Sequence, residues 1–197
     1  YIYEPSHNHI TIATSEPQLS LSALILMNIK FNLSKSKFNK ICLQKTAYFM
    51  NILSNTEYFH FKKAKYGPFD YSIDVVSKNI QEYQKYHNVH TTEEAYTILM
   101  QKLISQTTQE KLDFYIPFIK QATAFTNQFE TTEAVEGAGT ALFIIQQNDR
   151  IGFPDIVRQF KEWSEDKAAR FPEKSVISAV NSLEKFGFIE NTFLGYR

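Results

Sequence analysis

Few side chains in this sequence could ligate a metal or act as a nucleophile, and their spacing favours neither role. Two histidine pairs, His7 with His9 and His87 with His90, have no cysteine or acidic cluster at a metal-ligand spacing beside them. We therefore expect solvated histidines and no metal site. Cys42, the only cysteine, lies in an apolar helical stretch, where a thiol is expected to belong to the core.

Motifs that bind phosphate or carry out catalysis are also missing from the sequence. It contains no G-x-S-x-G, no H-E-x-x-H and no glycine-rich phosphate loop. The only close glycine pair is Gly137-Ala-Gly139, and no strand is expected before it. We therefore expect a chain that binds no cofactor and is not an enzyme by itself.

Composition and charge narrow the class of protein further. With 197 residues, 43% of them hydrophobic, the chain is long and apolar enough to bury a core, and no apolar run approaches the roughly 18 residues of a membrane span. Lys and Arg total 21 and so do Asp and Glu, so little or no direct nucleic-acid binding is expected. A single cysteine favours a reducing compartment, and the cytoplasm is the simplest prediction.

The elements that must position any site are predicted to be mainly α-helical, with minor β. A linker occupies residues 1–18, and a helical domain follows over 19–130. Its expected elements are helices at 19–31 and 37–53, a strand at 58–66, a helix starting at Pro68, and helices at 92–104 and 108–128. The helix at 37–53 is apolar nearly all round, which is typical of the centre of a domain.

Local signals refine these elements. The helix after Pro68 carries an apolar stripe made by Phe69, Ile73, Val76, Ile80 and Tyr83. Capping boxes, Thr91 with Glu94 and Thr107 with Glu110, are expected to open the next two helices. Pro117 should kink the second of these or mark its start.

A second domain is predicted over residues 131–197. A loop containing Gly137 and Gly139 is followed by helices at 140–147, 154–166 and about 171–186, and by a strand that starts at Phe188. This order indicates a winged helix-turn-helix on which the helical module packs. Its third helix would expose two lysines that Glu173 and Glu184 neutralise, so it is a poor reader of DNA.

The most specific pattern joins two segments of the helical domain. Gln44-Lys45, with Tyr48-Phe49 after it, precedes Tyr66-Gly67-Pro68-Phe69. This pattern resembles the "QK … YF … YGP" signature of the C-terminal toxin-binding domain of DarG-type antitoxins and, more distantly, the Panacea (SocA-like) antitoxin domain. The order of elements agrees over most of the chain, whereas the family's "GFE-x-P-Y-G" stretch is reduced to Glu136-Gly137-Ala138-Gly139.

The resemblance implies an antitoxin domain that binds a DarT-type toxin, a DNA ADP-ribosyltransferase. It also implies a macrodomain before residue 1, with Tyr1–Pro5 as the tail of its last strand. The expected mechanism is blockage of the toxin's DNA channel, with carboxylates in place of phosphates and aromatic rings in place of bases. The candidate partner-binding residues are Lys45, Tyr66, Phe69, Asp70, Tyr71, Asp74, Glu130, Glu133 and Glu136.

Two other functions stay open. The winged helix could make the chain a DNA-binding regulator of its own operon, and the Panacea-like similarity would suit a protein adaptor. Tyr66-Gly67-Pro68 could also be no more than a tight turn between a strand and a helix, which is compatible with a binding surface.

Overall fold

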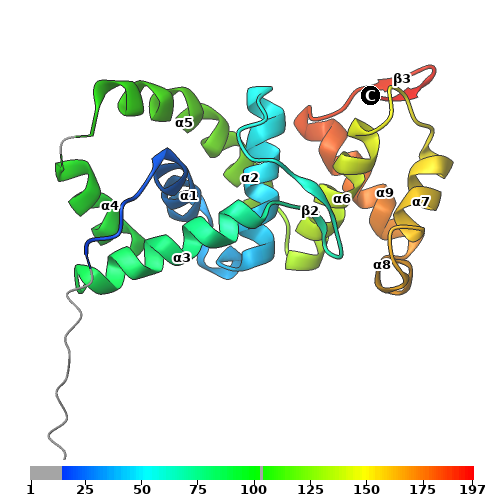
Figure 1. Cartoon of the computed structure of the whole chain (residues 1–197). Coiled ribbons are helices and arrows are strands. Elements are labelled where there is room, and N and C mark those ends of the chain that lie inside the picture. The colour runs from blue at the N-terminus through cyan, green and yellow to red at the C-terminus, as the bar shows by residue number, and fades with distance from the viewer. Residues whose placement is uncertain (1–14, 103) are drawn as a thin grey trace, which may run out of the picture.

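The computed structural model describes residues 15–102 and 104–197, and within them the fold is mainly α with two short antiparallel strand pairs (Figure 1). The first part contains α1 (Leu21–Asn32), the 3-10 turn η1 (Lys35–Lys37), α2 (Lys40–Ser54), β1 (Lys62–Ala64), β2 (Gly67–Phe69), α3 (Tyr71–Tyr86), α4 (Thr92–Gln101) and α5 (Gln106–Asn127). The second part contains α6 (Thr132–Gln146), α7 (Phe153–Lys161), α8 (Glu165–Arg170), α9 (Glu173–Phe186), β3 (Asn191–Thr192) and β4 (Gly195–Tyr196).

Helix α2 lies at the centre of the molecule, as its apolar surface predicts. It packs against α5 on one side and against α6 and β2 on another. Asn39 caps its first turn by accepting a hydrogen bond from the Cys42 amide at 2.9 Å, and Asn55, with φ 50°, ends it in the left-handed conformation. The core around α2 is continuous with that of the C-terminal helices.

The hairpin between α2 and α3 differs from the expected strand and helix. Only Lys62–Ala64 of the expected strand 58–66 forms β1, because Phe59 bonds through its backbone to the side chain of Asn51 instead. Gly67–Phe69 pairs with β1 as β2, so Pro68 lies in a strand and not in a helix. Helix α3 begins at Tyr71, where the Asp70 side chain caps the Ser72 amide.

The apolar stripe of α3 is confirmed at three of its five positions. Ile73, Ile80 and Tyr83 are buried, whereas Phe69 and Val76 are only half-buried. A stripe this narrow is enough to seat α3 across α1, with which it packs (Figure 1).

The capping signals give one correct and one incorrect prediction. The box at Thr91 and Glu94 is present at the start of α4. Helix α5 begins earlier than its expected box, because the Ser105 hydroxyl accepts from the Thr108 amide. Pro117 lies inside α5 and does not mark its start.

Helix α6 is the largest correction. The segment expected as a loop around Gly137 and Gly139 is helical from Thr132, capped by the Thr131 hydroxyl. The two glycines are not chain breakers here, since their missing side chains leave room for neighbours. A Cβ at Gly137 would lie 3.0 Å from the Phe171 ring, and one at Gly139 would lie 3.0 Å from the Lys45 chain.

The C-terminal elements follow the order of a winged helix-turn-helix. Helices α7, α8 and α9 come after α6, the expected helix 154–166 being divided at Lys161. The hairpin β3–β4, expected to begin at Phe188, begins at Asn191, and Ile151 bridges to Tyr196 beside it.

The two parts of the chain are in extensive direct contact. Helix α6 packs against α2 and β2 as well as against α9, and α2 and α6 lie side by side in the middle of Figure 1. The division at residue 130 therefore stays a prediction, and most of the expected linker 1–18 lies outside the described residues. In the described part of the chain, none of the helices has the length and apolar character that a bilayer crossing requires.

Candidate functional site

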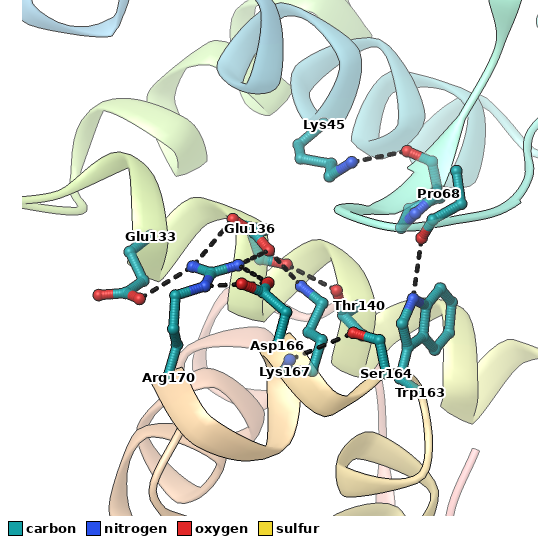
Figure 2. A network of polar contacts seen from close by, with 11 residues as sticks. Lys45, Pro68, Glu133, Glu136, Thr140, Trp163, Ser164, Asp166, Lys167 and Arg170 are labelled. Atoms are coloured by element: carbon teal, nitrogen blue, oxygen red, sulfur yellow. Dashed lines mark hydrogen bonds and ion pairs between the residues drawn. The ribbon is translucent and has the colours of Figure 1, made fainter.

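The two halves of the sequence motif meet in the structure, because Gln44 and Lys45 hold the hairpin. The Gln44 side chain binds both polar groups of the Asp70 backbone: it donates to the carbonyl at 2.9 Å and accepts from the amide at 3.0 Å. Next to it, the Lys45 ammonium donates to the Pro68 carbonyl at 2.7 Å (Figure 2). We call these contacts the hairpin clamp.

Lys45 reaches the hairpin through a passage lined by glycines. Gly139 lies against the methylenes of Lys45, and a Cβ at Gly67 would approach Thr140 Oγ1 at 2.7 Å and Lys45 Cε at 3.2 Å. Gly67 also has φ +94°, which favours glycine for a second reason. The side chain of Lys45 is 2% exposed, and desolvation, helped by the charge of Lys167, lowers its pKa to about 7.

A buried ion cluster lies beneath the clamp and joins α6 to α8 (Figure 2). The Glu136 carboxylate accepts from the Lys167 ammonium at 2.5 Å and from the Arg170 guanidinium at 2.7 Å. Arg170 also contacts Glu133 and Asp166, and these hydrogen bonds raise its pKa. Burial lowers the pKa of Lys167, although its bond to Glu136 opposes that effect. Since each charge has a partner, the cluster is suited to locking α8 in place.

The C-terminal helices also hold the outer strand of the hairpin. Trp163, which follows α7, donates its indole N–H to the Ala64 carbonyl at 2.8 Å, and the Lys63 ammonium lies 4.6 Å from the centre of the Trp163 ring. The hairpin is therefore fixed from both sides, by α2 on one and by the α7–α8 turn on the other. A hairpin with only three residue pairs would not hold its geometry alone.

The solvent-exposed residues around the clamp are aromatic or positively charged. Tyr66 is 45% exposed and Tyr71 is 72% exposed, while Phe69 is half-buried with Lys40 over its ring. We use the name aromatic patch for four residues that follow one another from the hairpin turn into α3: Tyr66, Phe69, Tyr71 and the exposed Val75. Exposed lysines at positions 62, 63 and 65 border it.

Three of the residues expected to bind a partner are not at the surface. Lys45, Asp70 and Glu136 are all buried. Each carries a charge or a polar group that reads as solvent-facing in sequence, but each is satisfied internally: Asp70 accepts from the backbone amides of His60 and Ser72 at 2.6 and 2.7 Å.

The other expected residues are accessible to different degrees. Tyr66 lies in the turn between β1 and β2, Phe69 in β2 and Tyr71 at the start of α3; the two tyrosines are exposed and Phe69 is half-buried. Asp74 is partly exposed, and its carboxylate is paired with Lys40 at 2.5 Å. Glu130 and Glu133 are exposed near the start of α6, away from the hairpin in sequence, and Glu133 is paired with Arg170 at 2.9 Å.

Sequence reasoning missed four residues that build the site. Gln44, Trp163, Lys167 and Arg170 have contact partners far along the chain. Only Gln44 belongs to the motif named above, and nothing in the spacing of Lys167 or Arg170 distinguishes them from surface charges.

The described residues contain no cluster that is suited to hold a metal ion. No group of three or more His, Cys, Asp or Glu side chains is arranged there to hold an ion. Cys42 is buried, and His87 bonds to Glu16 at 2.7 Å, whereas His7 and His9 lie outside the described residues.

Comparisons with protein-family models, with curated proteins and with solved structures give no match to this chain.

Proposed function

We propose that this chain is a cytoplasmic binding module that neutralises a toxin enzyme of the DarT type, a DNA ADP-ribosyltransferase, by covering its DNA-binding channel. The contact centres on the aromatic patch. The observation that carries the proposal is the hairpin clamp: the two halves of the antitoxin-like motif are in direct contact, and the residues next to the clamp, Tyr66 and Tyr71, are exposed on a rigid support.

Exposed aromatic side chains on a rigid support are suited to protein recognition. Tyrosine contributes a large contact area at a small cost in side-chain entropy, and aromatic residues are enriched among those that dominate binding energy. Because the backbone under Tyr66 and Tyr71 is held by Gln44 and Lys45, little further ordering is needed when a partner binds.

The burial of Asp70 and Glu136 changes how the channel would be covered. Neither carboxylate can replace a phosphate, and the pairing of Asp74 with Lys40 leaves it little net charge to offer. We therefore assign the contact chiefly to the aromatic rings, which would take the places of stacked bases. Glu130, which is exposed, supplies the accessible negative charge, because Glu133 is paired with Arg170 as Asp74 is with Lys40.

The test is a neutralisation assay with a DarT-type toxin. Purified chain is titrated into the toxin and a single-stranded DNA substrate, and the modified DNA is measured. We expect stoichiometric inhibition that DNA relieves by competition. The double variant Tyr66→Ala/Tyr71→Ala should weaken inhibition by about tenfold or more, as loss of two contact tyrosines does at protein interfaces.

A matched control separates this surface from exposed apolar groups in general. Phe193 is fully exposed at the tip of the β3–β4 hairpin, far in sequence from the patch, so Phe193→Ala should inhibit like the parent. Equal inhibition by the double tyrosine variant and the parent would exclude the patch. A stable ternary complex of toxin, chain and DNA would exclude channel blockage.

A DNA-binding regulator remains the second candidate because the C-terminal elements have the order of a winged helix. The exposed face of α9 carries Lys174 and Lys185 together with Glu173 and Glu184, so its formal charge cancels. We expect weak binding to the chain's own promoter that disappears as salt is raised. Submicromolar binding at physiological salt in a mobility-shift assay would favour the regulator.

A further inference from the structure

A cleft of about 530 Å³ opens between the end of α1, η1, the first turn of α2, and α3. Figure 1 shows these elements meeting on the side of the molecule where α3 crosses α1. Part of the lining is apolar and comes from Leu33, Phe38, Leu43 and Ile73. The volume lies within the range of sites for small organic ligands.

The charged lining of the cleft is unbalanced. Lys30, Lys37, Lys40 and Lys78 line it, and the only acidic residue in the lining is Asp74. Lys40 pairs with Asp74 at 2.5 Å, and the Lys37 ammonium donates to a backbone carbonyl at 2.8 Å. This leaves Lys30 and Lys78 as the available cations, one on α1 and one on α3.

These two lysines lack strong partners among the described residues. Lys78 has only Glu82 at 3.8 Å, and both of those side chains are largely exposed. Lys30 is half-buried and has neither a carboxylate nor a carbonyl within bonding distance, and burial lowers its pKa. An anion in the cleft would offset this desolvation of Lys30. The first turn of α2 adds the positive end of a helix dipole on the same lining.

The cleft also has an uncharged polar lining, which comes from α3. The Ser77 hydroxyl is buried and has no hydrogen-bond partner in the described part of the chain, although Ser77 lines the cleft beside Lys78. The hydroxyl oxygen is enclosed by protein atoms, so it is not open to a ligand in the cleft. Gln81, one turn further along α3, adds an amide to the same lining.

We propose that this cleft is a binding site for a nucleoside monophosphate. Its phosphate is neutralised by Lys30 and Lys78, its flat base lies against the apolar lining, and a polar edge of the base is met by Gln81. An inorganic anion would use only the lysines, and an uncharged apolar molecule would leave them unpaired. A heteroaromatic ring that carries a phosphate uses all three kinds of lining group.

The test is calorimetric titration of the purified chain with AMP, GMP, CMP and UMP, and with inorganic phosphate. At least one nucleotide should bind with a Kd below about 1 mM and more tightly than phosphate does. The double variant Lys30→Met/Lys78→Met should weaken that binding about tenfold or more, and Gln81→Ala should weaken it about threefold or more, as loss of a hydrogen bond does.

The control is Lys85→Met, because Lys85 lies exposed on the same helix and is not part of the cleft lining. It should bind like the parent, and thermal melts should show that all variants fold. The proposal is overturned if none of the four nucleotides binds, if phosphate alone binds as tightly as the best of them, or if the double lysine variant binds as the parent does. Toxin neutralisation is measured separately and does not enter this result.

Discussion

The buried amine of Lys45 should leave a measurable signature in how stability depends on pH. Its pKa is lowered to about 7 in the folded chain because the side chain is removed from water and Lys167 lies nearby, whereas the carboxylate of Glu136 only partly opposes these effects. In the unfolded chain the same amine has an ordinary pKa of 10.5. The folded and unfolded states therefore bind different numbers of protons between these two values.

The sign of the effect follows from that difference. Between pH 7 and 10.5 the unfolded chain holds a proton on Lys45 that the folded chain has released, so the free energy of unfolding rises with pH in this window. Each pH unit contributes about 1.4 kcal/mol, which gives a total of about 5 kcal/mol across the window. Below pH 7 the amine is charged in both states, and the folded chain bears the full free-energy cost of burying that charge.

Lys45→Met removes the titrating group and keeps a chain of similar length next to Gly139. The lost bond to Pro68 lowers stability by an amount that changes little with pH, so the pH dependence of the difference is the informative quantity. The free energy of unfolding is measured in urea melts of parent and variant at pH 7 and at pH 9.5. From the lower to the higher pH, the variant should lose about 3 kcal/mol of stability relative to the parent. Lys62→Met, at an exposed position, is the control and should show no such dependence.

Parallel stability curves for Lys45→Met and the parent over this range would refute the argument. They would mean that the amine is solvated or keeps its proton in the folded chain. A difference of the opposite sign would mean that the Lys45 ammonium is stabilised by folding, as in a strong ion pair, and the balance assigned to Lys167 and Glu136 would then be wrong.

Three further predictions concern the packing around the clamp. In urea melts, Gly67→Ala should lower the free energy of unfolding by at least about 1 kcal/mol more than Gly187→Ala does. Both glycines have positive φ, but only at Gly67 would a Cβ meet other atoms. Equal losses would show that the space around Lys45 and Gly67 is loosely packed. Glu136→Gln should cost about 3–5 kcal/mol by leaving a buried ammonium unpaired, and Glu133→Gln, at an exposed position, should cost under about 1 kcal/mol. Ile73→Ala should cost about 2–5 kcal/mol, and an unchanged melt would contradict its place in the core.

Several elements of the fold could be predicted from the sequence because their signals are local. The burial of α2 follows from its apolar surface, the inner face of α3 from the spacing of Ile73, Ile80 and Tyr83, and the start of α4 from a capping box. In each case the information lies within about one or two helical turns.

The start of α6 shows where local signals mislead. Glycines at 137 and 139 predict a loop when the chain is considered alone, since glycine weakens an isolated helix. In the fold these positions are where Phe171 and Lys45 approach the helix closely, and a larger side chain would collide with them. The propensity is overridden by packing partners that lie 34 residues or more away along the chain.

The sequence by itself determined the helical class, the central helix and the segments that meet at the clamp, because periodicity and capping are properties of neighbouring residues. Only the tertiary structure decided which charges are buried. Lys45 is satisfied by a carbonyl 23 residues away, and Glu136 by an ammonium 31 residues away. A charged side chain is expected at the surface unless it is paired, and the pairing becomes visible only when distant segments are brought together.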